Sequence, residues 1–537
     1  RLVEDDNSGV NLKLFHKHQP IPLSDVLPVL ENLGLRVLGE FPFRVVEADG
    51  TQFWIHDFEF TFGAGASLDI QETNALFRDA FAAVWSGQAE NDAFNRLVLL
   101  AGLPWRDVAL LRAYARYLKQ IRLGFELPYI ASTLVAHADI ARELVRLFRT
   151  RFYLARKLSA DDLAEMQGKL ERAILGALDD VAVLNEDRIL RRYLDLIKAT
   201  LRTNFYQNDD EGDAREYLSL KFDPTQIPEL PLPRPMFEIF VYSPRVEGVH
   251  LRGGKVARGG LRWSDREEDY RTEVLGLVKA QQVKNAVIVP VGAKGGFVPR
   301  RLPLGGSRDE VQQEAIACYR LFIQGLLDIT DNLVDGKVVP PANVVRHDGD
   351  DPYLVVAADK GTATFSDIAN GVSIEYGFWL GDAFASGGSQ GYDHKKMGIT
   401  ARGVWESVKR HFREMGIDTQ KEDFTVIGVG DMSGDVFGNG MLLSKQTKLL
   451  AAFDQRQPAA RLVIALVDPV ADHAGNPFAR RRVPVEVRYE RAFADMGADR
   501  RVAAKAEIAI RPARQLIDLV AQRKINRAEL GIGMLRY

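Results

Sequence analysis

Two lysines with small neighbours are the first candidates for chemistry in this sequence. Lys294 stands between Ala293 and Gly295, directly after the apolar run 287–291, which is typical of a strand. Small neighbours let a backbone approach a ligand closely, so we expect Lys294 in a loop with its amine directed into a cleft. Lys284 lies ten positions earlier (294 minus 284), at the other end of that run. Two ammonium groups that converge on one pocket would suit a dicarboxylate.

An aspartate after another strand-like run is the next candidate. Asp359 follows the apolar run 355–358 and opens a polar turn. The sequence around it fits a turn or helix-capping residue as well as it fits a site carboxylate.

A glycine-rich segment predicts a dinucleotide site. Gly428, Gly430 and Gly434 follow the strand-like run 424–427 with the spacing G-x-G-x-x-x-G, one residue longer than the usual fingerprint. The glycines permit a tight turn, and the next helix would hold a pyrophosphate at its N-terminus. Asp454 ends the next predicted strand, 20 residues after Gly434 (454 minus 434), where it could bind the adenosine ribose. An acidic residue at that place favours NAD over NADP.

The periodicity of apolar residues divides the chain into three kinds of structure. Residues 1–60 predict the β-α-β-β order of a ferredoxin-like α+β module. From about 70 to 206 the apolar residues repeat with the helical period, as at Ile140 and Leu144. After the polar and proline-rich stretch 207–235, strands and helices alternate, which predicts α/β layering.

Length and composition describe a globular chain of several domains, because 537 residues exceed what one core can hold. Hydrophobic residues at 46%, charged residues at 27% and a net charge of -3 give no basic surface for a nucleic acid, so we expect no such partner.

No apolar run approaches the ~18 residues of a membrane span, and there is no signal-peptide layout, so we expect no membrane partner and a cytoplasmic location. The single Cys318 excludes an intrachain disulfide, and the histidines lack metal-ligand spacing, so no metal is expected. Because the first residue is Arg1 rather than Met, we expect a piece of a longer protein.

Three blocks together resemble the substrate domain of glutamate dehydrogenases. They are Arg258-Gly-Gly-Leu-Arg262, then Lys284, then Gly292-Ala-Lys294-Gly-Gly296, against a family pattern of K-G-G-[IL]-R, a lysine in a helix and G-A-K-G-G. The chain is most similar to the very large NAD-specific bacterial enzymes, most strongly from about 236 to 454. The spacing between the two lysines also agrees with that subclass and is shorter than in the hexameric enzymes.

The resemblance implies a role for each candidate residue. Lys284 would bind the substrate α-carboxylate, Lys294 would activate water, and Asp359 would carry a proton to and from the substrate amino group. Arg258 stands where the hexameric enzymes have a substrate-carboxylate lysine. It keeps the charge with a different geometry. Thr400 resembles a second turn that contacts the cofactor.

The resemblance also implies a multidomain fold of α/β and α+β parts. We expect an ACT-like regulatory module at 1–65, a helical region at 66–206, a linker at 207–235, a substrate-binding α/β domain at 236–400 and a Rossmann-like NAD-binding domain at 401–537. Beyond about residue 455 the chain stops following the family. The NAD-binding domain is therefore expected to be divergent or incomplete there.

The implied activity is NAD-dependent oxidative deamination of L-glutamate to 2-oxoglutarate and ammonia, by a homo-oligomer with amino acids as candidate effectors. A dehydrogenase of leucine or phenylalanine is an alternative, because those relatives share the lysine pair and the aspartate. Arg258 argues against it by supplying a cation for a second carboxylate. An alternative from another class is a catalytically silent fragment that senses amino acids through residues 1–60.

Overall fold

The chain forms two compact units, Arg1–Gly391 and Tyr392–Tyr537. The computed structural model describes residues 2–4, 10–62, 70–153, 159–209, 211–284, 291–359, 362, 364–389, 397–429 and 439–453.

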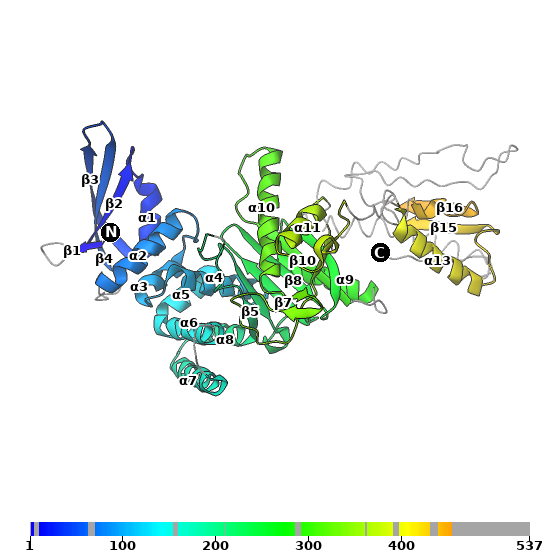
Figure 1. The fold of residues 1–537 in the computed structure, drawn as a ribbon, viewed down its shortest axis with the longest axis horizontal. Helices are drawn as coiled ribbons and strands as arrows, with labels where there is room; N and C mark the ends of the chain where they lie inside the picture. Colours follow the sequence, from blue (N-terminus) through cyan, green and yellow to red (C-terminus); the bar gives the residue numbers. More distant parts are fainter. Residues whose placement is uncertain are drawn as a thin grey trace, which may run out of the picture. The chain divides into compact units, whose positions relative to one another are not determined.

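The first unit begins with an antiparallel sheet covered by one helix (Figure 1). The strands lie in the order β1-β2-β4-β3, and the elements are β1 (Leu2–Glu4), β2 (Val10–Lys17), α1 (Leu23–Asn32), β3 (Leu35–Val46) and β4 (Gln52–Phe62). Leu12 and Leu14 alternate inward on β2, while Val26 and Leu30 are buried on α1. Alternate residues of a strand and residues four apart on a helix each form one face, so these side chains build a shared core. The predicted β-α-β-β order is confirmed.

A helical region follows this sheet. Its elements are α2 (Ile70–Trp85), η2 (Ala93–Arg96), α3 (Leu97–Leu100), α4 (Trp105–Gln120), α5 (Leu127–Ala136), α6 (Ala138–Phe152), α7 (Ala160–Asp179) and α8 (Leu184–Ala199). The predicted stripe residues Ile140 and Leu144 are buried, as expected for helices that pack on one another.

An eight-stranded mixed sheet forms the centre of the first unit. The strand order is β14-β13-β9-β10-β8-β7-β6-β5. Strands β5 to β8 and β10 pair in antiparallel fashion, whereas β10, β9, β13 and β14 run parallel. The bounds are β5 (Thr200–Thr203), β6 (Leu218–Phe222), β7 (Phe237–Tyr242), β8 (Val246–Arg252), β9 (Ala257–Trp263), β10 (Val291–Pro299), β13 (Val355–Ala358) and β14 (Ala385–Ser386).

The large sheet starts earlier in the sequence than the helix and loop pattern predicts. Strand β5 lies inside the predicted helical stretch, and β6 lies inside the predicted linker 207–235. Both strands are short and fully buried, so they lack the alternating pattern that reveals a half-exposed strand. A short turn, η3 (Pro224–Gln226), and a two-stranded ribbon, β11 (Asn332–Val334) with β12 (Lys337–Val339), complete this part.

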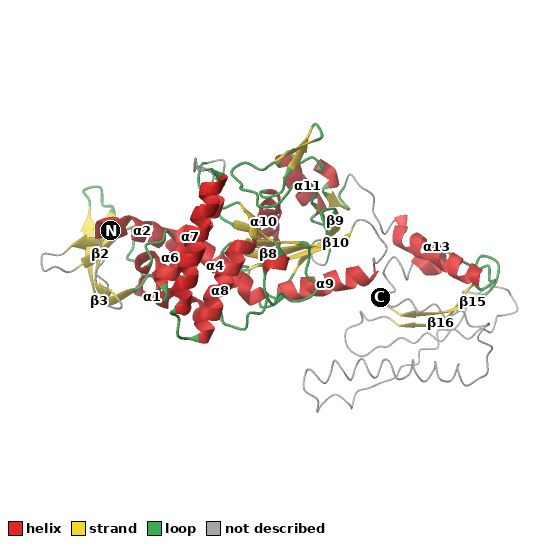
Figure 2. Cartoon of the chain, turned by 90° about the horizontal axis from the view of Figure 1, so that it is seen from below, coloured by secondary structure: helices red, strands yellow, loops and turns green. Residues whose placement is uncertain are grey.

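Helices cover both faces of the large sheet. Phe297 of β10 packs on Tyr319 and Phe322 of α10 (Arg308–Leu327), which with α11 (Ser366–Glu375) and η4 (Gly381–Ala383) lies on one face. The neighbouring Gly296 points the other way, because a Cβ there would meet Val274 of α9 (Tyr270–Lys284) at 2.7 Å. Figure 2 shows α9 alongside β10.

The second unit has one described helix and a pair of parallel strands. These are α13 (Ile399–Glu414), β15 (Phe424–Val429) and β16 (Thr447–Phe453), with a short turn at η6 (Gly440–Leu442). Trp405 and Phe412 on α13 pack their rings against Phe424 at the start of β15. The two strands that the sequence predicts here are confirmed. A parallel pair needs a crossover connection, which is the arrangement of a βαβ unit.

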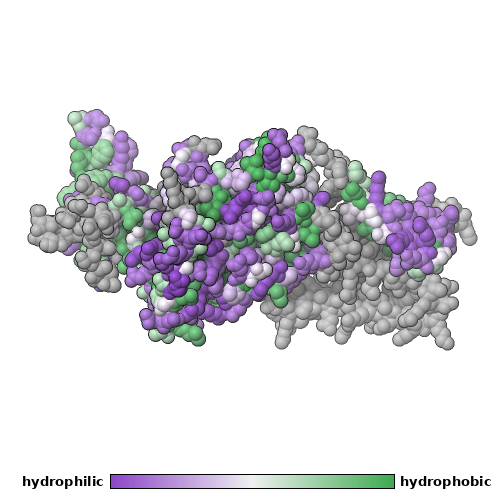
Figure 3. All heavy atoms as spheres, turned by 60° about the horizontal axis from the view of Figure 1, so that its bottom comes forward, coloured by the Kyte–Doolittle hydropathy of each residue, from purple (hydrophilic) through white to green (hydrophobic). Residues whose placement is uncertain are grey.

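One face of the described residues is mostly polar. Figure 3 shows hydrophilic side chains over most of the visible face, with apolar ones in separate patches. Within the described residues, no helix is both long and apolar enough to cross a lipid bilayer.

A buried ionic network joins strands β5, β6 and β8 of the large sheet to the segment that follows α10. Arg202 on β5 donates both terminal nitrogens to Asp331, and both side chains are fully buried. The network alternates cations with carboxylates, and its members are Arg202, Lys221, Arg252, Asp331, Asp348 and Asp351. Removing one member would deprive a buried charge of a counterion, which is costly.

Asp331→Asn should therefore lower the free energy of unfolding by about 3 kcal/mol, because the buried Arg202 guanidinium loses one of its two carboxylate partners and keeps only Asp348. Urea titration measures this change. The matched control is Glu375→Gln, which breaks the exposed pair with Arg320 and should cost less than about 1 kcal/mol. Equal effects of the two substitutions would contradict the importance of the buried network.

Candidate functional site

Strand register brings the predicted site residues of the first unit to one face of the large sheet. Gly292 pairs with Arg258 and Gly296 pairs with Arg262, and Lys294 lies between the two glycines on β10. Because alternate residues of a strand share a face, Arg258, Arg262 and Lys294 lie on the same side. Asp359 directly follows β13, which lies on the other side of β9.

Lys294 lies within strand β10 and not in a loop after it. Its neighbours Ala293 and Gly295 are paired with β8, and Lys294 itself is paired with Leu251. The predicted loop is therefore wrong. Strand β10 begins at Val291, which is the last residue of the predicted strand 287–291. Residues 285–290, which include most of the predicted strand, lie outside the described residues.

A lysine and an arginine hold the Asp359 carboxylate. The Lys294 Nζ atom lies 3.1 Å from Oδ2 of Asp359, and a terminal nitrogen of Arg262 lies 3.3 Å from Oδ1. The Lys294 and Asp359 side chains are 20% and 18% exposed, so both are only partly buried. Each oxygen of the carboxylate thus faces a cation within reach of solvent.

A tight turn fixes the backbone at Asp359. The Asp359 N–H donates to the Thr362 hydroxyl at 2.9 Å, and that hydroxyl donates to the carbonyl of Leu261 on β9 at 2.7 Å. Thr362 is fully buried. The predicted strand-to-turn junction is confirmed, and the turn is tied to the neighbouring strand.

Arg262 and Glu273 are site residues that the sequence analysis did not single out. Glu273 on α9 accepts hydrogen bonds from Arg262 at 2.7 Å and from the Ser264 hydroxyl at 2.7 Å. Burial alone would raise the pKa of Glu273, but these two hydrogen bonds and the Arg262 charge lower it overall. Burial likewise acts to lower the pKa of Arg262, and the bond to Glu273 with the Asp359 charge raises it overall. A signal in the sequence is the separation of four residues between Arg258 and Arg262, which puts both on one face of a strand.

The remaining two residues of the predicted substrate site stand at the end of α9 and near the start of β9. Lys284 is the last residue of α9, and its side chain lies outside the described part of the structure. Arg258 is exposed on β9, and its carbonyl accepts a hydrogen bond from Gln281 at 3.3 Å. Gln281 stands three residues before Lys284, so the last turn of α9 lies beside the start of β9.

The predicted cofactor residues belong to the second unit. Gly428 lies in β15, which pairs in parallel with β16 up to Val429 and Phe453. Gly430, Gly434 and Asp454 lie outside the described residues. Thr400 is in the first turn of α13, so the predicted turn at this position is wrong. The residue before the helix, Gly398, has the left-handed conformation with φ 63° that glycine adopts readily.

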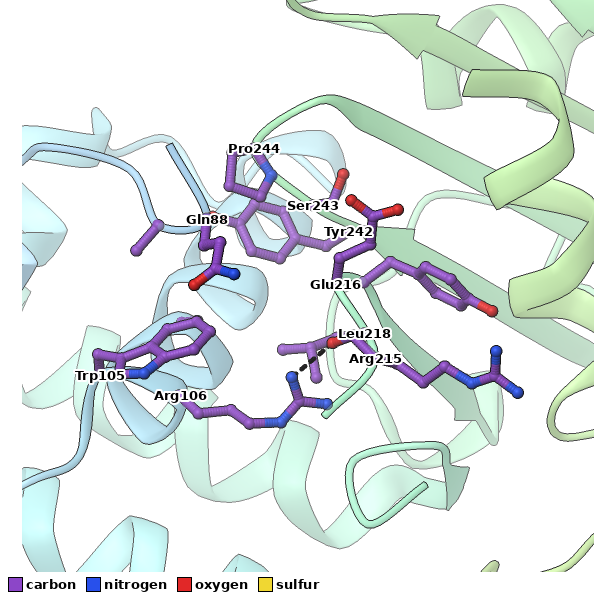
Figure 4. A pocket seen from close by; sticks show the side chains of 12 residues that line it. Gln88, Trp105, Arg106, Arg215, Glu216, Leu218, Tyr242, Ser243 and Pro244 are labelled. Atoms are coloured by element: carbon purple, nitrogen blue, oxygen red, sulfur yellow. Dashed lines mark hydrogen bonds between the residues drawn. The ribbon is translucent and has the colours of Figure 1, made fainter. Parts of the chain in front are cut away.

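A small pocket elsewhere in the first unit is not a second substrate site. It lies between α4 and the sheet, where Trp105 and Arg106 face Tyr242 and Ser243 (Figure 4). Its volume of about 20 Å³ is room for a single water molecule. An amino acid would not fit in it.

A lysine in contact with a carboxylate on one face of an α/β sheet is an arrangement that can transfer protons, and comparison with known proteins shows the family of the chain. Residues 173–516 match the model of the bacterial NAD-glutamate dehydrogenase catalytic domain. Residues 89–154 match glutamate dehydrogenase helical motif 3, and residues 1–73 match the glutamate dehydrogenase ACT3 domain. The chain therefore belongs to the bacterial NAD-glutamate dehydrogenase family. The catalytic match continues to residue 516, so the expectation that the likeness ends near 455 is wrong.

Similar full-length proteins carry the same family name. The chain is 73% identical over 474 residues to the NAD-specific glutamate dehydrogenase of Pseudomonas aeruginosa, covering 88% of this chain and 29% of the relative. It is 61% identical to that of Halomonas elongata over 90% of this chain and 29% of the relative. It is 54% identical to that of Mycobacterium tuberculosis over 89% of this chain and 30% of the relative. The chain thus spans less than one third of the length of these relatives.

Glu273→Gln should destabilise the protein in a pH-dependent way. A carboxyl whose pKa is lowered by folding stabilises the native state above its unfolded value of ~4.3, and this contribution is lost as the pH falls through the folded value. At pH 7 the variant should be less stable by roughly 1.5 to 3 kcal/mol, typical of hydrogen bonds to a charged group. Urea titrations from pH 7 downward should show this difference shrink.

The control for that series is Glu126→Gln, whose 80% exposed side chain pairs with Lys119 at 3.5 Å. It should show little difference from the unmodified protein at any pH. A Glu273→Gln difference that stays constant over the acid range would contradict the role given to the Glu273 charge.

Proposed function

We propose that this chain supplies the substrate site of an enzyme that oxidatively deaminates L-glutamate with NAD. The observation that carries the proposal is the contact of Lys294 with Asp359 at 3.1 Å, on a sheet face that also presents Arg258. The family and the names of the full-length relatives support the same activity.

Substrate recognition is assigned to cations around this face. Lys284 at the end of α9 is proposed to bind the α-carboxylate, and Arg258 on β9 is proposed to bind the second carboxylate. The last turn of α9 contacts β9 at Arg258 through Gln281, which supports a shared pocket. A leucine or phenylalanine side chain would leave the Arg258 charge without a partner, which disfavours those substrates.

The proton transfers are assigned to the contacting pair. Asp359 would take a proton from the substrate ammonium group, so that the amine can become an imine as hydrogen leaves the α-carbon. Lys294 would then assist water to attack the imine carbon. Asp359 would return a proton to the departing nitrogen, which leaves as ammonia and gives 2-oxoglutarate. The two groups already touch, so these steps need little rearrangement.

The second unit is proposed to hold the cofactor. Its parallel strands β15 and β16 fit a dinucleotide fold, and Gly428 lies at the end of the first of them. Gly428, Gly430 and Gly434 would approach the pyrophosphate, Asp454 would bind the ribose, and Thr400 would add a further contact. NAD, when bound, would take up the hydrogen and electrons that leave the substrate α-carbon.

The remaining parts are proposed to regulate or assemble the enzyme. The proposed division is an ACT-like module at 1–65, a helical region from 66 to the end of α8, a substrate domain that also takes in β5 and β6 and runs to 400, and a Rossmann-like NAD-binding domain at 401–537. The enzyme would be a cytoplasmic homo-oligomer with amino acids as candidate effectors.

Initial rates on a small panel of substrates and cofactors test the proposed function. The full-length protein should oxidise glutamate with NAD faster than leucine or phenylalanine, and NAD should be strongly preferred over NADP because of Asp454. Equal rates on leucine, or equal use of NADP at matched concentrations, would contradict the substrate or the cofactor assignment. Absence of activity on all three amino acids would favour the silent sensing alternative.

Two lysine variants should separate the chemical step from substrate binding. Lys294→Ala should lower kcat by ~100- to 10,000-fold, as expected for loss of general acid–base assistance. Lys284→Ala should mainly raise the KM for glutamate, by the roughly 1.5 to 3 kcal/mol of a charged hydrogen bond to a carboxylate. Both variants should keep the KM for NAD. A Lys294→Ala enzyme with normal kcat and a raised glutamate KM would make Lys294 a second anchor.

A further inference from the structure

Helix α9 begins against a glutamine from the helical region. Gln120 is the last residue of α4 and is almost completely buried. Its Oε1 accepts the backbone N–H of Arg271 in the first turn of α9 at 3.2 Å, and its Nε2 donates to the carbonyl of Glu267 at 2.9 Å. The first N–H groups of a helix have no partner inside the helix. Gln120 therefore caps α9 from a distant part of the chain.

The end of α4 that carries Gln120 is firmly fixed on the sheet. Tyr117, one turn earlier on α4, stacks on Phe222 of β6 with ring centroids 4.5 Å apart and packs on Phe240 of β7. Contacts of this kind leave little freedom for the last turn of the helix. The cap is therefore held in place relative to the sheet.

The same turn of α9 is anchored to the sheet by a buried ion pair. Arg271 donates two hydrogen bonds to Glu238 of β7 at 2.6 and 2.7 Å, and both side chains are fully buried. The first turn of α9 is thus held on one side by β7 and on the other by the helical region.

The position of α9 controls the geometry of the candidate site. Glu273, two residues after Arg271, binds Arg262, and Arg262 binds Asp359. Gly296 and Gly292 flank Lys294, and a Cβ at either would come within 2.7 Å of α9 side chains, namely those of Val274 and Gln281. A shift of α9 would therefore disturb the contacts on both sides of Lys294.

We propose that Gln120 is a positioning residue of the glutamate site, acting through α9 on the Arg262–Asp359 pair and on the helix end at Lys284. This inference rests on the proposed function for its kinetic consequence. Loss of the cap should displace or loosen α9, whose 15 residues extend about 22 Å from the cap to Lys284. The helical region thereby becomes part of the machinery that orients the substrate carboxylate.

Gln120→Met in the full-length protein tests the proposal, because methionine fills the same space without either hydrogen bond. The KM for glutamate should rise about tenfold, equivalent to the loss of one to two hydrogen bonds, while the KM for NAD stays within about twofold. A purely structural defect would reduce the amount of active enzyme and thus kcat, with both KM values unchanged. Hydrogen exchange without ligands should be faster at residues 270–274 and unchanged in α10.

The matched control is Tyr193→Phe, which removes a buried hydrogen bond from Tyr193 to the Leu111 carbonyl, elsewhere on α4. It loosens α4 without touching α9, so glutamate KM and α9 exchange should stay as in the unmodified protein. A second variant, Gln120→Glu, keeps an acceptor for the Arg271 N–H, loses the donor to Glu267 and adds a buried carboxylate. Its glutamate KM should lie between those of the unmodified protein and Gln120→Met.

The outcomes separate this proposal from the proposed function. If the unmodified protein oxidises glutamate but Gln120→Met matches Tyr193→Phe in glutamate KM and in α9 exchange, the positioning role is wrong and the function stands. If the unmodified protein does not oxidise glutamate, the proposed function fails. Hydrogen exchange alone then tests whether Gln120 caps α9. Unchanged exchange at residues 270–274 in Gln120→Met would contradict this capping role.

Discussion

The chain of charges from Glu273 through Arg262 to Asp359 and Lys294 is the interaction on which the candidate site depends. Arg262 bonds to Glu273 and to Asp359, and Lys294 takes the other Asp359 oxygen. Two strands, one turn and one helix supply these residues, so the site exists only when β9, β10, the turn after β13 and α9 are assembled. These close contacts between opposite charges fix the positions of the side chains, and Lys294 and Asp359 stay partly exposed.

Close approach of α9 to the sheet makes this assembly possible. Gly292 and Gly296 stand on either side of Lys294, and the absence of side chains there lets α9 lie directly on β10. The opposite face of the same strand carries Phe297, which packs under α10. Strand β10, which contains Lys294, thus lies between α9 and α10. The helical region contacts α9 through Gln120.

Local sequence patterns predicted the elements well and their pairing poorly. The β-α-β-β order at the N-terminus, the strand before Asp359 and the strand pair of the second unit were visible because each has its own periodicity. The position of Lys294 inside a strand was missed because small residues suggest a loop, whereas here they serve close packing. Arg262 and Glu273 were missed because their partnership joins a strand to a helix, which no local pattern records.

The account is tested most directly by the rate of the chemical step in an Asp359→Asn variant of the full-length protein. Asparagine keeps the shape of the side chain but cannot carry the proton, so kcat for glutamate oxidation should fall by ~100- to 10,000-fold. The control Asp309→Asn changes an exposed carboxylate in the first turn of α10 and should leave kcat unchanged. An Asp359→Asn enzyme that retains normal kcat, with a fold equal to that of the control, would contradict the assignment of this cluster as the catalytic site.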